Sequence, residues 1–352
     1  MRLLVLLVVV LAGCVRVAVP GLSGPLVGLQ RLTVKDPLSE KVLDAIVFYP
    51  SATPLEGAAT RFGPWPLEGR LDVPISRERH PFVVLIHGHQ GSRFGHHDLG
   101  EALARAGYVV AAVDHAGDSW NDQSTFGTDR GVYGRAYQAS ALIDAVLADP
   151  RLGPWVDPER IGAAGFSAGG LTALILVGAV PDFSRVRFYC ERHPEDRDFC
   201  SSAPRLTPGT PRPALDERVR AAFTMAPVGV LLSEASLEGV RQPVYVAEAE
   251  RDTVLLPEEN AAVVLRGLRL DSARVVPDAG HFVFLAPCPA ALRDEMRVQC
   301  VDPPGVDRVA VHAMLATDAL AFFERSFGPG GPPPPPPLEG PPARQVPEGR
   351  FR

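Results

Sequence analysis

The stretch that decides the fold is IGAAGFSAGG, which occupies residues 161–170 of the 352-residue chain. It ends in the pattern G-x-S-x-G, and helix-compatible residues continue from Leu171. A serine between a strand and a helix in this pattern lies on a turn so sharp that side chains two residues before and after it would collide with it. Gly165 and Gly169 remove that collision, and the strained turn would expose the Ser167 hydroxyl. Ordinary glycine-rich connections also contain this pattern, so the rest of the chain must support the interpretation.

Apolar strands and amphipathic helices alternate around this stretch. The runs FVVLIHG and YVVAAVD, at residues 82–88 and 108–114, are almost continuously apolar, as is typical of parallel strands buried on both faces. Further elements are predicted as an edge hairpin at residues 32–50, strands at residues 219–226, 243–249 and 273–277, and helices at residues 99–106, 135–147, 255–265 and 306–327. This order predicts a doubly wound, mostly parallel α/β sheet whose ligand site lies at the carboxyl ends of the strands.

Residues 181–216 interrupt the alternation. The segment is polar and proline-rich, and it contains Cys190 and Cys200. A segment of this length without an evident repeat of strand or helix is usually functional or disordered. We expect an insertion above the sheet that is held by a disulfide and forms one wall of a pocket.

Two further residues follow predicted strands downstream of Ser167. Serine is a weak nucleophile that needs an adjacent base, and the base needs an acid to orient it. Asp252 comes after the strand at residues 243–249, and His281 comes after the strand at residues 273–277, so both would reach the rim that presents Ser167. These three residues are the predicted catalytic triad, with Glu250 and Asp278 as rival acids.

Acyl transfer also needs two backbone N–H groups that face the developing oxyanion. The residue after the nucleophile, Ala168, is expected to supply one, and His89 in the loop HGHQG at residues 87–91 is expected to supply the other. His89, His96 and His97 also suggest a metal site, but carboxylates at ligand spacing are missing nearby. A solvated loop and helix start is favoured, and no metal or cofactor is predicted.

The composition is that of a globular protein, with 46% hydrophobic residues, 22% charged residues and a formal net charge of -6. A nucleic-acid partner is not expected, because such proteins usually carry a basic patch or stripe. The expected partners are a small-molecule or lipid ester substrate and a membrane. The oligomeric state is not predicted.

The chain begins with a targeting pattern. Met1 and Arg2 precede an apolar run at residues 3–11, which is too short to cross a bilayer and is typical of a secretory signal peptide. The tetrad LAGC at residues 11–14 resembles the lipobox of bacterial lipoproteins, in which the cysteine is lipid-modified. We expect a signal peptide at residues 1–13, lipidation at Cys14, a tether at residues 14–30, and anchoring in the bacterial cell envelope. An incidental Cys14 after an ordinary signal peptide is the alternative.

The other end of the chain is a low-complexity tail. Residues 328–352 are rich in proline and glycine and include six consecutive prolines at residues 332–337. This composition predicts a mobile, polyproline II-like segment. The folded domain is therefore expected at residues 31–327.

An exported domain can form disulfides. Apart from Cys14, the four cysteines are Cys190, Cys200, Cys288 and Cys300, which allow three pairings. Closeness in sequence favours Cys190–Cys200 and Cys288–Cys300. A zinc site is the rival, but the chain has no C-x-x-C spacing.

With these residues in place, the chain resembles the α/β hydrolases. More narrowly, it is similar to the bacterial predicted dienelactone hydrolases, which are related to platelet-activating-factor acetylhydrolases. The matching stretches are VLIHG with GSR, GYVVAAVDH, GFSAGG, AGHF with APC, and CVD with DR, which together cover residues 32–327. The resemblance implies Ser167, Asp252 and His281 as the triad and the His89 and Ala168 amides as the oxyanion hole.

One difference from the family name matters. True dienelactone hydrolases use a cysteine nucleophile, whereas this chain has Ser167. The resemblance therefore implies a serine carboxylic-ester hydrolase, and its acetylhydrolase branch implies short acyl chains. A lipase or polyester hydrolase of the same fold, or a binding lipoprotein without activity, are the alternatives, because a fold does not determine a substrate.

Overall fold

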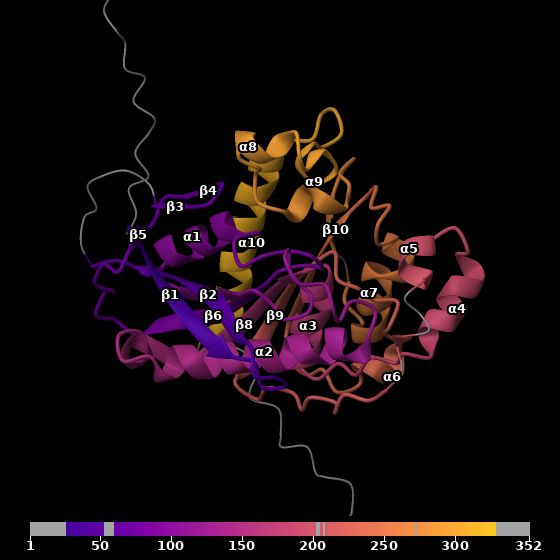
Figure 1. Ribbon diagram of the computed structural model, residues 1–352, viewed down its shortest axis with the longest axis horizontal. Helices are drawn as coiled ribbons and strands as arrows, with labels where there is room; N and C mark the ends of the chain where they lie inside the picture. Colours follow the sequence, from indigo (N-terminus) through magenta and orange to yellow (C-terminus); the bar gives the residue numbers. More distant parts are fainter. Residues whose placement is uncertain (1–25, 53–59, 202–204, 207, 272, 329–352) are drawn as a thin grey trace, which may run out of the picture.

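The computed structural model describes residues 26–52, 60–201, 205, 206, 208–271 and 273–328 (Figure 1). The expected signal peptide, the lipidation site Cys14 and residues 329–352 of the expected tail lie outside these ranges. In the part of the chain that is described, no helix is both long and apolar enough to cross a membrane.

A nine-stranded mixed sheet forms the centre of the domain, with the strand order β11-β10-β9-β8-β6-β7-β2-β1-β5. The parallel strands are β6 (His80–Ile86), β7 (Val109–Val113), β8 (Val156–Phe166), β9 (Val219–Met225), β10 (Val244–Ala249) and β11 (Arg274–Val276). The antiparallel strands β1 (Val27–Lys35) and β2 (Val42–Pro50) join them at β7, and β5 (Arg70–Leu71) borders β1. The expected doubly wound, mostly parallel sheet is confirmed.

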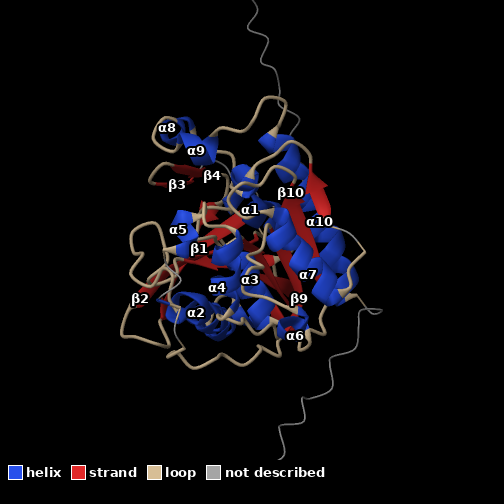
Figure 2. Ribbon diagram, turned by 90° about the vertical axis from the view of Figure 1, so that its right-hand side faces the viewer, coloured by secondary structure: helices blue, strands red, loops and turns tan. Residues whose placement is uncertain are grey.

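Helices cover both faces of the sheet, and each face has its own hydrophobic core (Figures 1 and 2). One core contains residues of α2 (Asp129–Ala148), α3 (Ala168–Leu176), α6 (Glu234–Leu237) and α7 (Ala261–Leu268). The other contains residues of α1 (His97–Arg105) and α10 (Arg308–Phe327). Successive residues of β6 alternate between the cores, with Val84 in the first and Val83 and Leu85 in the second. The strands are therefore apolar on both faces, as their sequences indicate.

The predicted tether is too long. Residues 27–30 belong to β1, where Leu29 is fully buried and pairs with Phe48 of β2. The two-residue strand β5 pairs with β1 only at Gly28 and Leu29, so residues 32–35 of the predicted edge hairpin have no strand on their outer side in the described part of the chain. Burial of Val27 and Leu29 against the second core explains why the ordered domain begins before residue 31.

The insertion at residues 181–216 contains regular structure of its own. It includes α4 (Arg185–Arg192) and α5 (Arg197–Cys200), which lie together at the side of the molecule far from β1 (Figure 1). The disulfide Cys190–Cys200 joins these two helices, and the second disulfide is Cys288–Cys300. The two pairings favoured by closeness in sequence are thus the ones present.

Candidate active site

Ser167 lies on the turn between β8 and α3. Its backbone has φ 56° and ψ −118°, a region that non-glycine residues rarely adopt. A Cβ atom at Gly165 would lie 2.1 Å from the carbonyl oxygen of Gly169, and a Cβ atom at Gly169 would lie 2.1 Å from that of Ile86. Both neighbours are backbone atoms, so only glycine fits at these positions, as the sequence pattern predicts. The Ser167 amide donates to the Met225 carbonyl at 2.9 Å, which holds the strained turn against β9.

Three side chains from three strand ends meet at this turn. Nε2 of His281 lies 3.1 Å from Oγ of Ser167, and Nδ1 of His281 lies 2.6 Å from Oδ2 of Asp252. All three residues are buried. A carboxylate can only accept, so Nδ1 carries the proton and Nε2 is free to accept from the serine hydroxyl. The arrangement is that of a nucleophile, a base and an orienting acid.

The rival acids point elsewhere. The Glu250 carboxylate accepts a hydrogen bond of 2.8 Å from the Asp278 amide, and the Asp278 carboxylate pairs with Arg251 on the exposed surface. The other oxygen of Asp252 accepts from the Val254 and Leu255 amides at 2.9 and 2.7 Å. Asp252 is therefore oriented by its own loop and leaves Oδ2 for His281.

A pair of histidines, His96 and His312, holds the segment that carries His281. This segment is the short helix η4 (His281–Phe284). Nδ1 of His96 lies 3.0 Å from the Phe284 carbonyl, and Nε2 of His312 lies 2.9 Å from the Val283 carbonyl. Burial lowers the pKa of His96 to about 4, so this residue is a neutral donor near neutral pH. Burial opposes ionisation of Asp98, but the His312 contact outweighs it and lowers the pKa of Asp98 to about 2.

The expectation of a solvated histidine cluster was wrong. His96 and His97 are both buried at the start of α1, because this helix end packs beneath η4. A carboxylate is also close, since Glu101 lies 3.6 Å from Nδ1 of His97. Within the described ranges, however, no group of three or more histidine, cysteine or acidic side chains could hold a metal ion.

The two predicted oxyanion donors border the same space as Ser167. Both His89 and Ala168 line the cavity that the Ser167 side chain enters. Among the described residues, neither backbone amide donates to a protein group. Both ring nitrogens of His87, by contrast, make hydrogen bonds within the protein, because Nδ1 donates to the Gly88 carbonyl and Nε2 accepts from the His115 amide, which follows β7. Burial lowers the pKa of His87 to about 3, which keeps it neutral.

Sequence reasoning missed two charged residues at this site. Asp118, just beyond β7, and Arg135, in α2, form a buried ion pair of 2.8 Å that also lines the cavity. Burial alone would raise the pKa of Asp118, but Arg135 and His89 hold it below its ordinary value. Burial lowers the pKa of Arg135, and Asp118 opposes that change. The available signal was a lone arginine on an apolar helix face.

The cavity beside Ser167 has a volume of about 390 Å³, within the range of small-molecule sites. Most of its walls are apolar, with Phe126 and Val132 before the elbow and Val228, Val230 and Leu231 after it. The insertion supplies Tyr189, Phe199 and Leu206. The expected pocket wall is therefore present in the structure.

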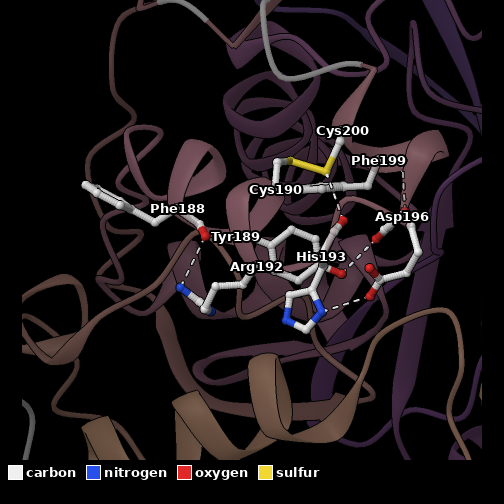
Figure 3. Close-up of a disulfide and its surroundings, with 9 residues drawn as sticks. Phe188, Tyr189, Cys190, Arg192, His193, Asp196, Phe199 and Cys200 are labelled. Atoms are coloured by element: carbon white, nitrogen blue, oxygen red, sulfur yellow. Dashed lines mark hydrogen bonds and ion pairs between the residues drawn. A yellow bond between two sulfur atoms is a disulfide. The ribbon is translucent and has the colours of Figure 1, made fainter.

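The disulfide Cys190–Cys200 lies beside Tyr189 and Phe199, two residues of this wall (Figure 3). The Tyr189 ring makes an edge contact with Phe199, with ring centroids 5.4 Å apart. The Tyr189 hydroxyl donates to Asp196 at 2.7 Å. Tyr189 and Phe199 are the sequence neighbours of the two bridged cysteines, so the crosslink holds both rings in place.

Comparisons with known proteins agree with this fold. No family model matches the chain. The uncharacterized peptidase YuxL of Bacillus subtilis (strain 168) is 31% identical over 110 residues, which are 30% of this chain and only 16% of that protein. A solved structure of a ferulic acid esterase from Streptomyces cinnamoneus superimposes with a TM-score of 0.60 at 23% identity, covering 88% of this chain and 92% of that chain. At this identity the likeness shows that the chain has the α/β-hydrolase fold.

Proposed function

We propose that this protein is a serine carboxylic-ester hydrolase that works through an acyl-enzyme. The observation that carries the proposal is the position of the Ser167 hydroxyl, which lies 3.1 Å from Nε2 of His281 and borders the cavity of about 390 Å³. The esterase and peptidase named in the comparisons support a hydrolase. The chain covers little of the peptidase, so the ester chemistry rests on the site itself.

In the acylation step, Ser167 attacks the ester carbonyl carbon while His281 removes the hydroxyl proton. Asp252 stabilises the resulting imidazolium without taking its proton. The carbonyl oxygen becomes an oxyanion and accepts from the His89 and Ala168 amides. The bond to the alcohol oxygen then breaks, and the alcohol leaves with the proton from His281.

In the deacylation step, water replaces the alcohol. His281 removes a proton from the water as it attacks the acyl-enzyme, and the same two amides bind the second oxyanion. When the bond to Ser167 breaks, His281 returns the proton to the serine oxygen. The products are a carboxylic acid and the free enzyme.

The size of the preferred acyl group is a separate part of this proposal. The family resemblance favours short acyl chains, which remains a prediction. One solved neighbour is a ferulic acid esterase, so methyl ferulate is a second test substrate. A lipase or polyester hydrolase would instead prefer long-chain or polymeric esters.

The test is hydrolysis of p-nitrophenyl esters with acyl chains from C2 to C12, with Ser167→Ala beside the wild type. We expect loss of activity in Ser167→Ala and a sharp fall of wild-type activity beyond C4. Activity that survives Ser167→Ala would exclude this residue as the nucleophile. An inactive wild type that a fluorophosphonate does not label would favour the binding lipoprotein.

We also propose that the protein is an exported lipoprotein anchored in the cell envelope through Cys14. The support is the apolar run at residues 3–11 followed by LAGC. Replacement Cys14→Ser should release the protein from the membrane fraction. A variant that stays in that fraction would contradict lipidation at this cysteine.

A further inference from the structure

Arg135 connects the two segments that carry the candidate oxyanion donors, the loop with His89 and the helix that begins at Ala168. It projects from α2 and is buried, with 2% of its surface exposed. Its guanidinium group donates to Asp118 Oδ2 at 2.8 Å and to the Asp118 carbonyl at 3.2 Å. It also donates to the His87 carbonyl and, through Nε, to Thr172 Oγ1 at 3.3 Å. One side chain thus contacts three separate segments of the site.

Two of these contacts fix the loop that carries the His89 amide. The His87 carbonyl is a direct acceptor for Arg135. Oδ1 of Asp118 accepts from Nδ1 of His89 and, at 3.3 Å, from the Gln90 amide. The loop is therefore held on both sides of Gly88, at His87 before it and at His89 and Gln90 after it.

The third contact reaches the other donor. Thr172 lies one turn into α3, and its hydroxyl donates to the Ala168 carbonyl at 2.9 Å. The same oxygen accepts from Nε of Arg135. Ala168 is the first residue of α3. This chain of hydrogen bonds therefore connects Arg135 to the residue whose backbone amide is the second candidate oxyanion donor.

This geometry suits arginine in particular. A guanidinium group presents its donors in one rigid plane, whereas a lysine ammonium group cannot reach three separated acceptors at once. A buried arginine is costly unless it is paired, and Asp118 supplies the countercharge. A purely structural ion pair would need only the carboxylate. Arg308 is an example, because it binds Asp302 with two hydrogen bonds of 2.8 Å.

We propose that Arg135 is a positioning residue that sets the distance between the His89 and Ala168 amides, acting through Asp118 and Thr172. The inference rests on the proposed esterase function, because the two amides matter only if an oxyanion forms between them. It predicts an effect on the reacting state and little effect on substrate binding. Loss of one oxyanion donor costs about 10²–10³-fold in kcat, so displacement of both by a fraction of an ångström should cost about 10–100-fold.

The experiment compares Arg135→Lys with Arg308→Lys. Both variants keep a positive charge on a buried side chain that is paired with an aspartate, but only the first lies at the site. We would measure kcat and KM with p-nitrophenyl butyrate, the rate of inactivation by a fluorophosphonate, and the Tm. Arg135→Lys should lower kcat and the inactivation rate together by about 10–100-fold with KM nearly unchanged, and Arg308→Lys should leave all three kinetic values near those of the wild type.

A milder pair of variants covers the case in which Arg135→Lys does not fold. Thr172→Val removes the link to α3 and leaves the Arg135–Asp118 pair intact. Its matched control is Thr317→Val, since Thr317 makes the same hydroxyl bond, at 2.9 Å, to the carbonyl four residues earlier in α10. We expect kcat to fall by about 3–10-fold in Thr172→Val and to stay near the wild-type value in Thr317→Val.

The outcomes separate the two proposals. Folded Arg135→Lys or Thr172→Val enzymes that keep the wild-type kcat and inactivation rate would overturn the positioning role and leave the esterase function standing. An equal loss in Arg308→Lys would also overturn it, because any buried arginine would then have the same effect. A wild type that neither hydrolyses the ester nor reacts with the fluorophosphonate would overturn the esterase function and this inference with it.

Discussion

Oδ2 of Asp252 accepts a hydrogen bond of 2.6 Å from Nδ1 of His281, and both residues are almost fully excluded from solvent. A charge-assisted bond of this kind is stronger in a buried site than in water. It also selects one tautomer of His281, because only Nδ1 can carry the proton while the carboxylate is ionised. The orientation of the base that faces Ser167 therefore depends on the acid behind it.

This dependence predicts that Asp252→Asn will lower kcat by about 10⁴-fold with little loss of stability. The amide group keeps an oxygen for the Val254 and Leu255 amides but places N–H donors toward His281. Nδ1 must then accept, so Nε2 is protonated and cannot take the serine proton. Kinetics with p-nitrophenyl butyrate, with Tm as a measure of folding, provide the measurement.

Asp278→Asn is the matched control for that variant. Asp278 is the rival acid from the sequence, and its carboxylate pairs with Arg251 at the surface. Exposed ion pairs contribute little to stability, and this one does not contact His281. The kcat should therefore stay within about twofold of the wild type. A larger loss in Asp278→Asn than in Asp252→Asn would transfer the acid role to Asp278.

The elbow glycines are predicted to tolerate no side chain. In Gly165→Ala the new Cβ atom would lie 2.1 Å from the Gly169 carbonyl oxygen, a backbone atom that cannot move without displacing α3. We expect destabilisation of about 3 kcal/mol or more, together with loss of activity. Urea unfolding of the purified variant, or its failure to accumulate, measures the effect.

Gly134→Ala is the control for the elbow variant, because Gly134 lies inside α2 and its added Cβ would meet Leu38 at an ordinary 3.6 Å. Alanine is the better helix former, so this variant should be as stable as the wild type or more stable by up to about 1 kcal/mol. If Gly165→Ala matched it in stability, the steric account of the elbow would be wrong.

Local sequence patterns were sufficient to predict the three site residues that come after strands. The glycine spacing around Ser167 and the positions of Asp252 and His281 after strands predicted residues that the structure brings into hydrogen-bond contact. The Arg135 network could not be predicted in this way. Arg135 contacts His87, 48 residues earlier, and Thr172, 37 residues later, and no periodicity connects these positions.

The same reason explains the errors at the histidines and at the N-terminus. His96 is polar and precedes a helix, which indicates a solvated position, yet its ring donates to Phe284, 188 residues further along the chain. Residues 27–30 are too few to show strand alternation by themselves. Their place in β1 depends on pairing with β2 and on burial of Leu29, and both are tertiary effects.

A contact between the insertion and the body of the protein predicts a pH-dependent stability. Nε2 of His193, at the end of α4, lies 3.3 Å from Oε1 of Glu259. The Glu259 hydrogen bond raises the pKa of His193 against the opposing effect of burial, and a hydrogen bond with Glu195 raises it as well. Burial would raise the pKa of Glu259, but its contacts with His193 and Arg192 outweigh this and lower it. Each group therefore favours ionisation of the other.

The signs of these shifts set the pH range. The raised pKa of His193 contributes stability that is fully present below its unfolded value of about 6.5 and is lost as pH rises through the folded value. The lowered pKa of Glu259 contributes stability that is present above about 4.5 and is lost as pH falls through the folded value. His193→Gln should lower the Tm by about 1–4 °C near pH 5.5 and leave it unchanged near pH 9. A Tm difference that is independent of pH would contradict the ionic contact.

The two disulfides are predicted to affect activity differently. They close loops of similar size, with sequence separations of 10 and 12 residues, so loss of either should destabilise the protein by about 3 kcal/mol. Only Cys190–Cys200 lies beside residues of the cavity, because Tyr189 and Phe199 are the neighbours of its cysteines, and no cavity residue falls between Cys288 and Cys300.

The double variant Cys190→Ser with Cys200→Ser should therefore change substrate selection. Without the crosslink, the Tyr189 and Phe199 rings lose their fixed position, and kcat/KM for an ester with a bulky apolar group should fall by about tenfold relative to that for an acetyl ester. Cys288→Ser with Cys300→Ser has a similar cost in stability and should leave this ratio unchanged. Methyl ferulate and p-nitrophenyl acetate, assayed well below each variant's Tm, give the ratio. An equal change in both double variants would mean that the disulfides act through stability alone, and that the wall formed by α4 and α5 does not select the substrate.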